Sequence, residues 1–336
     1  MLKDKDRIFQ NLYNDKGSDI ESSKERGDWT NTKDLIEKGR DWIINEVKAS
    51  ELRGRGGAGF PTGLKWSFAP KELNSRPHYL VINGDESEPG TCKDRDILRF
   101  EPHKLIEGCL IAAYAVQAHV CYIYIRGEYF IDGEKLQAAI DEAYEKNLIG
   151  KNASGTGWDL DIYIHYGAGA YICGEETALI ASIEGRRAEV EVRPPFPVTE
   201  GLYKKPTVVN NVETLAAATG ILINGADKFS AIGNKKSAGT KLVCFDSFFN
   251  NPGVYEIEMG TPMKKVLNDI GGGFKEPIKA LQIGGPLGGV IPIDEAEKLN
   301  LDFQEFTAAG FMLGHASIVS IPKDFPMVEY IHHLFE

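Results

Sequence analysis

Cysteine is scarce and scattered in this sequence. No two cysteines form a C-x-x-C pair; the five are Cys92, Cys109, Cys121, Cys173 and Cys244. Zinc and iron–sulfur sites need closely spaced thiolates, so this spacing predicts no metal centre of either kind. An odd, scattered set is typical of reduced thiols in a cytosolic protein. The seven histidines show no metal-ligand spacing either.

The sequence also lacks basic charge and long apolar segments. Lys+Arg number 38 against 49 Asp+Glu, which gives a formal net charge of -11. Nucleic-acid phosphates need a basic face, so we expect no DNA or RNA partner. The most apolar stretch, 105–125, is interrupted by Glu107, Gln117 and His119, which favours a helix and a strand over a membrane span. The polar N-terminus has no signal-peptide core.

What is present is a globular composition. The chain is 42% hydrophobic and 26% charged over 336 residues, a length that suits about two domains. Residues 1–33 are polar and rich in turn formers, which predicts an irregular arm. Within 34–238, a helical pattern at 34–50 precedes β-rich runs at 78–84, 121–127 and 159–166, which alternate with helical patterns at 103–119 and 133–149. This alternation predicts an α/β domain with a parallel sheet. The β-β-α-β pattern over 239–295 predicts a separate small α+β domain.

A glycine-rich run, RGRGGAGFPTGLKWSF, occupies 53–68. It contains G-x-G-x-x-G at Gly54, Gly56 and Gly59, but a helical pattern precedes it where the Rossmann fingerprint needs a strand, so we exclude that fold. The run could be a flexible linker. Its cations and large aromatic side chains instead favour a site for a flat anionic cofactor. There, bare backbone would approach the ligand, cations would meet phosphate, and aromatics would stack.

Three further segments each have a plain structural interpretation and a functional one. NGDESEPG (83–90) is either a solvated turn or a ligand site at a strand end. In GAGAYICGEETALIASIEG (167–185), Glu175 and Glu176 would complement a helix dipole, while the small residues leave room for a ligand. In VVNNVETLAAA (208–218), Asn210 and Glu213 match a capping box, and the same helix start could hold a phosphate.

In this order the four motifs resemble those of the NADH-binding FMN flavoprotein subunit of respiratory complex I. That family includes the diaphorase subunits of NAD-linked hydrogenases and formate dehydrogenases. The resemblance covers about residues 8–336. It implies an α/β parallel-sheet domain that binds FMN, with the glycine-rich loop near its N-terminus and NADH stacked on the flavin ring. It also implies that the module after residue 239 is a ubiquitin-like β-grasp domain.

The matching motif positions imply site residues for both ligands. FMN contacts would be Gly54, Arg55, Gly56, Gly57, Lys65, Asn83, Asp85, Glu86, Tyr171, Gly174, Glu175, Glu176, Asn210, Asn211 and Thr214. NADH contacts would be Phe60, Lys65, Phe68, Glu88, Glu175 and Phe196. Hydride passes between the cofactors, so no side chain is expected to act as a nucleophile or general base. Glu88 and Glu175 would orient and tune the rings.

The sequence departs from the family pattern at its C-terminal end. The family continues into a helical domain that opens with a cysteine run binding a [4Fe–4S] cluster. Those ligands are absent from this chain, which would make it either a fragment or a shortened relative without the cluster. We expect 296–336 to be a connector toward a domain that is absent here. A second departure is LGHASIVSIPKDFP (313–326), which replaces a glycine-richer LGTGG-type segment.

We therefore predict an NADH dehydrogenase (diaphorase) module of the NADH:quinone oxidoreductase type, which transfers hydride from NADH to FMN within a larger complex. The expected partners are NADH and an iron–sulfur subunit. The expected location is cytoplasmic, peripheral on the cytoplasmic or matrix side of the inner membrane. The alternative is a non-catalytic scaffold or assembly subunit, which the missing cluster motif favours. The retained Lys65, Asp85, Glu88 and Glu176 oppose it, because a scaffold needs no such charge pattern.

Overall fold

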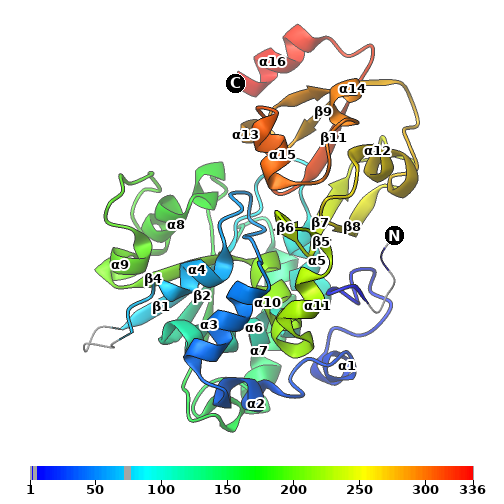
Figure 1. The fold of residues 1–336 in the computed structure, drawn as a ribbon. Coiled ribbons are helices and arrows are strands. Elements are labelled where there is room, and N and C mark those ends of the chain that lie inside the picture. The colour runs from blue at the N-terminus through cyan, green and yellow to red at the C-terminus, as the bar shows by residue number, and fades with distance from the viewer. Residues whose placement is uncertain (1, 3–5, 72–76, 336) are drawn as a thin grey trace.

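The larger domain is built on a parallel sheet. The computed structural model describes residues 2, 6–71 and 77–335 (Figure 1). The sheet has four strands in the order β3-β2-β1-β4, which are β1 His78–Gly84, β2 Ala118–Ile125, β3 Asp161–Tyr166 and β4 Thr207–Asn211. The first three lie where the β-rich runs predicted them, and all neighbouring pairs are parallel. The expected α/β architecture is therefore confirmed.

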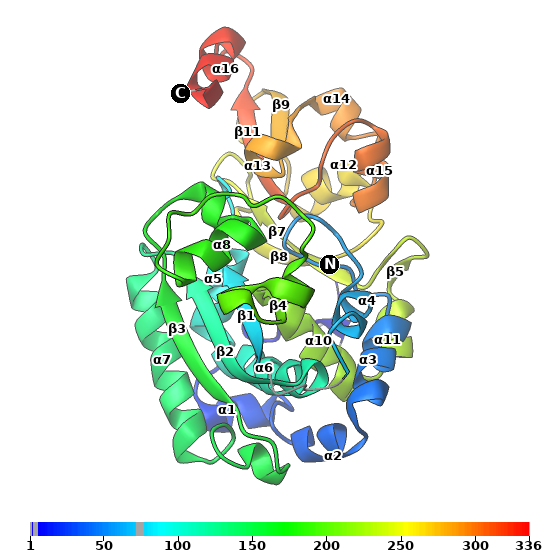
Figure 2. The ribbon, with the colours of Figure 1, turned by 90° about the vertical axis from the view of Figure 1, so that its left-hand side faces the viewer.

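Helices cover both faces of this sheet (Figure 2). One face is covered by α6 Pro102–Val116, α7 Phe130–Glu145 and α10 Val212–Asn224. The apolar stretch that could have suggested a membrane span is thus the buried helix α6 followed by β2. On the other face α8, Glu176–Ile183, packs Leu179 and Ile180 against Val81 and Tyr124 of the sheet. Among the described residues, no helix is both long and apolar enough to cross a membrane.

The short strand β4 was not expected, and the helix start after it differs from the prediction. The two valines of β4 are followed by two asparagines, so in the sequence this segment resembles the start of a helix more than a strand. The N-cap of α10 is Asn211, whose side chain accepts from Thr214 N. Asn210 instead accepts from Trp66 Nε1, and the carboxylate of Glu213 is buried among lysines. The predicted capping box of Asn210 and Glu213 is therefore wrong.

The N-terminal residues are mostly irregular but belong to the larger domain. They contain α1 Ile20–Glu25, and they are followed by α2 Thr32–Glu37 and α3 Arg40–Ala49. Gly39, at φ 89°, splits the single helix expected over 34–50. Phe9, Leu12 and Trp29 are buried in the main core, so this segment packs as part of the domain.

The second domain is a mixed five-stranded sheet in the order β10-β9-β11-β7-β8. Its strands are β7 Thr240–Phe245, β8 Gly253–Glu258, β9 Ile278–Ile283, β10 Val290–Pro292 and β11 Ser317–Pro322. β11 lies between β9 and β7, antiparallel to the first and parallel to the second. This is the expected β-grasp arrangement, but the predicted boundary at 295 is wrong. The central strand comes from residues expected to form a connector, so the domain extends to 322.

Short elements complete both domains. In the larger domain they are α4 Thr62–Ser67, α5 Lys93–Phe100, η2 Ala153–Gly155, η3 Tyr171–Gly174, α9 Pro197–Glu200, η4 Leu202–Lys204, α11 Ala226–Ser230, β5 Gly233–Asn234 and β6 Ser237–Ala238. In the β-grasp domain they are α12 Met263–Lys265, η5 Val266–Ile270, α13 Gly285–Gly288, α14 Ile293–Ala296 and α15 Phe303–Ala308. The chain then continues into α16, Met327–Phe335, which has no buried residue.

Candidate functional site

The four sequence motifs meet at the carboxyl edge of the parallel sheet. β1 and β4 lie side by side and end at Gly84 and Asn211. The glycine-rich loop lies against Asn211, because a Cβ on Gly56 would be 2.9 Å from the Asn211 Cβ. Asn83 Nδ2 donates to Gly174 O at 2.8 Å, which brings the third motif to the same edge. Ligands of open α/β sheets bind at this edge.

Two glycines at this edge leave backbone uncovered. Gly54 and Gly174 do not have positive φ, and a Cβ on either would meet no atom closer than 3.5 Å and 3.6 Å, respectively. Neither conformation nor packing within the chain therefore requires glycine there. Gly57 and Gly59 are different, because their φ values of 113° and 63° disfavour side chains. Uncovered backbone at 54 and 174 fits the close approach of a flat ligand.

Beside this backbone lie two exposed aromatic rings and a chain of charges. The Phe60 and Phe68 ring centroids are 6.4 Å apart, and the two side chains are 47% and 52% exposed. Lys65 Nζ lies 3.0 Å from Glu176 Oε2. Glu176 Oε1 pairs with Arg193 at 2.8 Å. Apolar rings next to a partly exposed lysine can bind a ligand that is both aromatic and anionic.

The other aromatic residues divide into exposed and structural ones. Tyr171 and Phe196 are exposed. Within the described part of the chain, no ring contact joins Phe196 to Phe60 or Phe68. Trp66, which lies in the glycine-rich motif, is fully buried, and its Nε1 donates to Asn210 Oδ1 at 2.8 Å. Trp66 is thus a core residue and not part of a stacking surface.

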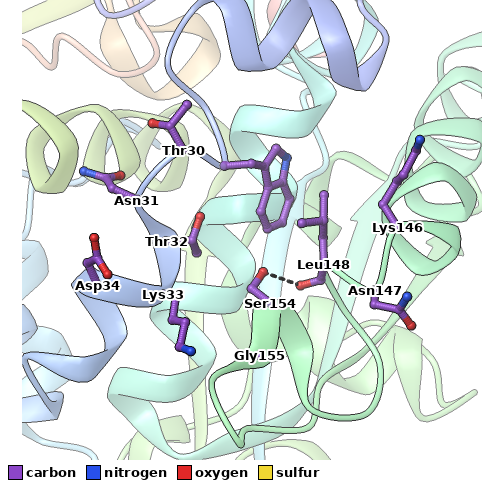
Figure 3. A pocket seen from close by; sticks show the side chains of 11 residues that line it. Thr30, Asn31, Thr32, Lys33, Asp34, Lys146, Asn147, Leu148, Ser154 and Gly155 are labelled. Atoms are coloured by element: carbon purple, nitrogen blue, oxygen red, sulfur yellow. Dashed lines mark hydrogen bonds between the residues drawn. The ribbon is translucent and has the colours of Figure 1, made fainter.

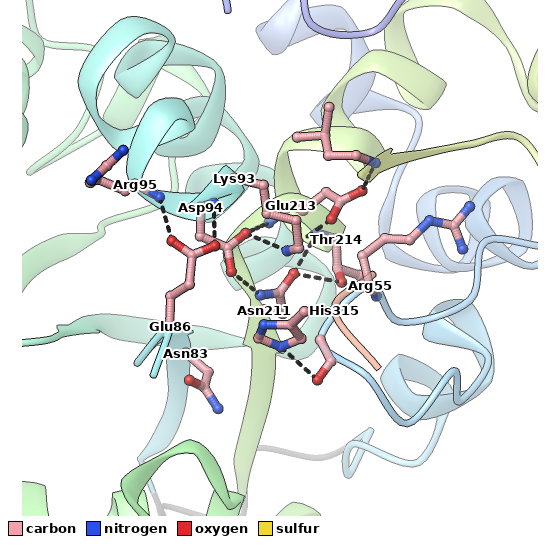
Figure 4. A network of polar contacts seen from close by, with 12 residues as sticks. Arg55, Asn83, Glu86, Lys93, Asp94, Arg95, Asn211, Glu213, Thr214 and His315 are labelled. Carbon is pink, nitrogen blue, oxygen red and sulfur yellow. Dashed lines mark hydrogen bonds and ion pairs between the residues drawn. The ribbon is translucent and has the colours of Figure 1, made fainter. Parts of the chain in front are cut away.

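Below the edge of the sheet lies a buried network of charges (Figure 4). Lys93 Nζ lies 2.8 Å from both Asp94 Oδ1 and Glu213 Oε2, and Lys241 Nζ lies 3.5 Å from the same Glu213 oxygen. Asp94 also accepts from Asn211 Nδ2 at 2.7 Å. Burial and the two lysines act in opposite directions on Glu213, and its pKa is lowered. The network holds β4, α5, α10 and β7 together beneath the site.

Groups that the sequence suggested for phosphate binding instead have partners within the chain. The N–H groups of Glu213 and Thr214, at the start of α10, donate to Asp94 Oδ1 and Asn211 Oδ1. Arg55 is fully buried, and its guanidinium donates to the carbonyls of Ala238 and Thr240. Burial lowers the pKa of Arg55 to about 10. In this structure Arg55 ties the glycine-rich loop to the β-grasp domain and does not present its charge to a ligand.

The carboxylates that follow β1 have different surroundings. Glu86 is buried and accepts from the N–H groups of Asp94 and Arg95 and from the Tyr129 hydroxyl. Burial and the neighbouring Asp94 raise the pKa of Glu86 to about 8. Burial also raises the pKa of Asp85 to about 6. Glu86 therefore anchors the start of α5, so its position in the motif has a structural explanation.

Glu175 also has a structural role. It is the N-cap of α8, and its Oε2 accepts from Thr177 N at 2.8 Å and Ala178 N at 3.1 Å. Its Oε1 lies 3.5 Å from Arg193. The plain interpretation of an acidic residue at a helix start is thus confirmed for Glu175. Its neighbour Glu176 is the carboxylate that reaches Lys65.

Glu88 lies against the β-grasp domain, a contact that no sequence pattern predicted. Its carboxylate accepts from Ser317 Oγ at 3.1 Å and faces His315 N at 3.4 Å. The His315 ring donates through Nε2 to Gly56 O at 2.8 Å. Burial, with Lys93 and Lys241 nearby, lowers the pKa of His315 well below its usual value. The one sequence signal for these contacts was that 313–326 departs from the family pattern.

The sequence patterns also did not indicate three charged residues of the buried network, which are Lys93, Asp94 and Lys241. Lys93 and Asp94 follow NGDESEPG within TCKDRD, so their closeness to the motif was the available signal. Lys241 lies in a predicted strand, where no sequence signal indicated a buried charge. Ligand atoms of Glu86, Asp94 and His315 lie within 4.8 Å of one another. Both carboxylates already accept hydrogen bonds and Lys93 contacts Asp94, so the group does not resemble a cation site.

Two cavities are lined by other residues. One, of about 380 Å³, is lined by Trp29, Asn31 and Lys146 among others (Figure 3). The other, of about 600 Å³, lies between α8 and α9 and is lined by Thr177, Ile180 and Tyr203 among others. Neither contains a residue proposed for FMN or NADH, so the candidate site is the open edge of the sheet.

Comparison with known proteins identifies relatives of the whole chain. The model of the Nuo51 FMN-binding domain family matches residues 47–219. The F subunit of NADH-quinone oxidoreductase in Rickettsia bellii is 51% identical over 337 aligned residues, which cover 99% of this chain and 81% of that protein. Its counterpart in Rickettsia typhi is 52% identical, with 99% and 80% covered.

A solved structure shares the fold. It is an NAD⁺-reducing [NiFe]-hydrogenase, known in an air-oxidised and an H₂-reduced state. The match has a TM-score of 0.79 and 35% identity, and it covers 91% of this chain. The chain spans about half, 51%, of the length of that hydrogenase chain.

Proposed function

The chain belongs to the family of NADH-quinone oxidoreductase F subunits and carries their FMN-binding domain, and from this membership we propose that it binds FMN and oxidises NADH. The observation that carries the proposal is the uncovered backbone of Gly54 and Gly174, next to the exposed rings of Phe60 and Phe68. The residues present fit a flat aromatic cofactor with a second aromatic ligand beside it.

Bound FMN would supply the hydride-accepting chemistry, and the chain would bind and orient the two ligands. Gly54 and Gly174 would let the flavin lie against the backbone. Lys65, held by Glu176 at 3.0 Å, would place a positive charge beside the ligands. Phe60 and Phe68 would offer an apolar surface for the nucleotide. The remaining FMN and NADH residues assigned by motif position are part of this proposal, except that the side chains of Arg55 and Glu86 would support the site from within the chain instead of contacting a ligand.

Flavin titration tests the proposal directly. We expect the purified protein to quench FMN fluorescence with a stoichiometry near one, and anaerobic NADH to bleach the bound flavin. Gly174→Val should abolish quenching while the protein stays folded, because its added carbons would occupy the space left for the flavin. Ala231→Val, at the exposed end of α11, is the matched control and should bind FMN normally. Folded wild-type protein that does not quench FMN would refute the proposal.

We further propose that electrons leave the chain through an iron–sulfur partner subunit, at the cytoplasmic or matrix side of a membrane. The support is that the relatives are named as subunits of NADH-quinone oxidoreductase. The chain alone should therefore reduce small diffusible acceptors such as ferricyanide, but not a quinone. Rapid quinone reduction by the isolated chain, or a [4Fe–4S] signal in its EPR spectrum, would contradict this.

A further inference from the structure

Two cysteines meet where the larger domain contacts the β-grasp domain. Cys92 directly precedes α5 of the larger domain, and Cys244 lies in β7 of the β-grasp domain. The Cys92 N–H donates to Cys244 Sγ at 3.5 Å, and the two thiols also share a hydrogen bond. Both cysteines are free. A disulfide requires two cysteines whose backbones lie close together, so this pair can be bridged with little movement of the chain.

The two thiols differ in exposure and in their electrostatic surroundings. Cys92 is partly exposed, whereas Cys244 is buried. The hydrogen bond from Cys244 is the main cause that lowers the pKa of Cys92. Arg95 and Lys93 act in the same direction, against burial and Asp96, and the start of a helix also favours a thiolate. The same hydrogen bond, together with burial, raises the pKa of Cys244. Cys92 is therefore the reactive member of the pair.

A second pair of cysteines has the same closeness without the exposure. Cys109 of α6 and Cys121 of β2 also share a hydrogen bond, and both are fully buried. Burial, followed by that hydrogen bond, raises the pKa of Cys121 well above its usual value. A reagent in solution meets the thiolate of an exposed cysteine far more readily than a buried thiol. Oxidation should therefore distinguish the two pairs.

We propose that Cys92 and Cys244 are a redox pair, which hydrogen peroxide converts into a disulfide that joins the β-grasp domain to the larger domain. The Cys92 thiolate attacks one oxygen of peroxide, the O–O bond breaks, and the other oxygen leaves as water with a proton from solvent. The Cys244 sulfur then attacks the resulting sulfenic acid, the S–O bond breaks, and the hydroxide leaves as water with the Cys244 proton. The two thiols are oxidised and the peroxide is reduced. Neither FMN nor NADH takes part, so the inference does not depend on the proposed function.

The test is treatment of the folded chain with hydrogen peroxide, followed by a count of free thiols and mapping of cross-linked peptides. In wild type, the number of free thiols should fall by two, and a reducing thiol should restore both. The cross-link should lie within one chain and join the peptides of Cys92 and Cys244. Cys244→Ser should stop at the sulfenic acid of Cys92, which dimedone traps. Cys92→Ser should keep all of its remaining thiols.

Cys109→Ser is the matched control, because it removes one thiol of the fully buried pair. This variant should form the disulfide between Cys92 and Cys244 as readily as wild type. A thiol count that peroxide leaves unchanged in folded wild-type protein would overturn the inference. A cross-link between two chains, or one that joins Cys109 to Cys121 and spares the proposed pair, would overturn it as well.

Discussion

At the scale of single residues, we predict that Glu88, which motif position assigns to NADH, disfavours NADPH by repelling its additional phosphate. Two like charges about 4 Å apart interact by about 4 kcal/mol at an effective dielectric constant of 20, and about 1.4 kcal/mol is a factor of ten. Glu88→Gln should therefore narrow the gap between NADH and NADPH about tenfold, mainly by improving NADPH. The measurement is flavin reduction by each nucleotide at low and high salt. Glu37→Gln, at an exposed surface pair with Lys33, is the control. An unchanged ratio would exclude Glu88 from this role.

Trp66 is a residue of the glycine-rich motif that belongs to the hydrophobic core. It is fully buried, and its indole donates to Asn210 Oδ1 at 2.8 Å. Trp66→Phe removes that donor and leaves a cavity, so we expect a loss of about 1–3 kcal/mol in the free energy of unfolding. Urea denaturation measures it. Trp42→Phe changes a partly exposed indole and should cost less; equal losses in the two variants would argue against the Trp66 hydrogen bond.

At the scale of elements, the packing of α6 on α10 depends on Gly108. A Cβ there would lie 2.6 Å from Thr219 Oγ1 and 2.9 Å from the backbone oxygen of Leu215. Alanine is the better helix former by about 1 kcal/mol, but overpacking costs about 1–3 kcal/mol, and here the obstacle is backbone. Gly108→Ala should therefore lower the free energy of unfolding, as measured in urea.

Gly220→Ala is the matched control within α10. Its Cβ would meet the Ile8 Cγ2 methyl at 3.1 Å, and that flexible side chain can move aside. We expect a change near zero or a small gain in stability. Equal changes in the free energy of unfolding in the two alanine variants would show that the close contact between α6 and α10 does not require glycine at position 108.

At the scale of the whole molecule, buried acids make stability depend on pH. Burial raises the pKa of Glu107 and of Glu256 to about 7, and that of Glu86 to about 8. Above the usual carboxyl pKa, the folded state therefore holds protons that the unfolded state has lost. Its stability must fall as pH rises through these values. Burial lowers the pKa of His103 and of His315, so below about pH 6.5 these two residues make stability rise with pH and oppose the effect of the acids. We therefore expect the free energy of unfolding to decline between about pH 6.5 and 8.

Glu107→Gln tests this decline. The carboxylate accepts from Trp29 N and from the Thr32 hydroxyl, and an amide can accept from the first and donate to the second. At pH 8 the variant should gain up to about 3 kcal/mol over wild type, because one pKa unit corresponds to about 1.4 kcal/mol. Near pH 5 the two should be similar. Unfolding in urea at several pH values measures this, with the exposed Glu145→Gln as control. A difference that does not vary with pH would contradict the assignment.

The sequence by itself determined the parallel sheet and the edge at which the motifs meet. β1, β2 and β3 are apolar runs with local periodicity, and parallel strands place their carboxyl ends together, so the loops that follow Gly84, Ile125 and Tyr166 had to meet at one edge. The resemblance of the four motifs to those of a known family identified the family and predicted its FMN cofactor. These inferences depended on residues close together in the chain.

Only the tertiary structure decided which side chains at that edge face a ligand. Arg55 and Glu86 look available in the sequence, but both are buried by partners distant in the chain, Thr240 and Tyr129. β11 completes the second sheet from residues that looked like a connector, because its pairing with β7 joins positions far apart. The contact of Ser317 with Glu88 follows from that pairing. Local patterns cannot specify it, since burial and long-range contacts depend on how the two domains pack.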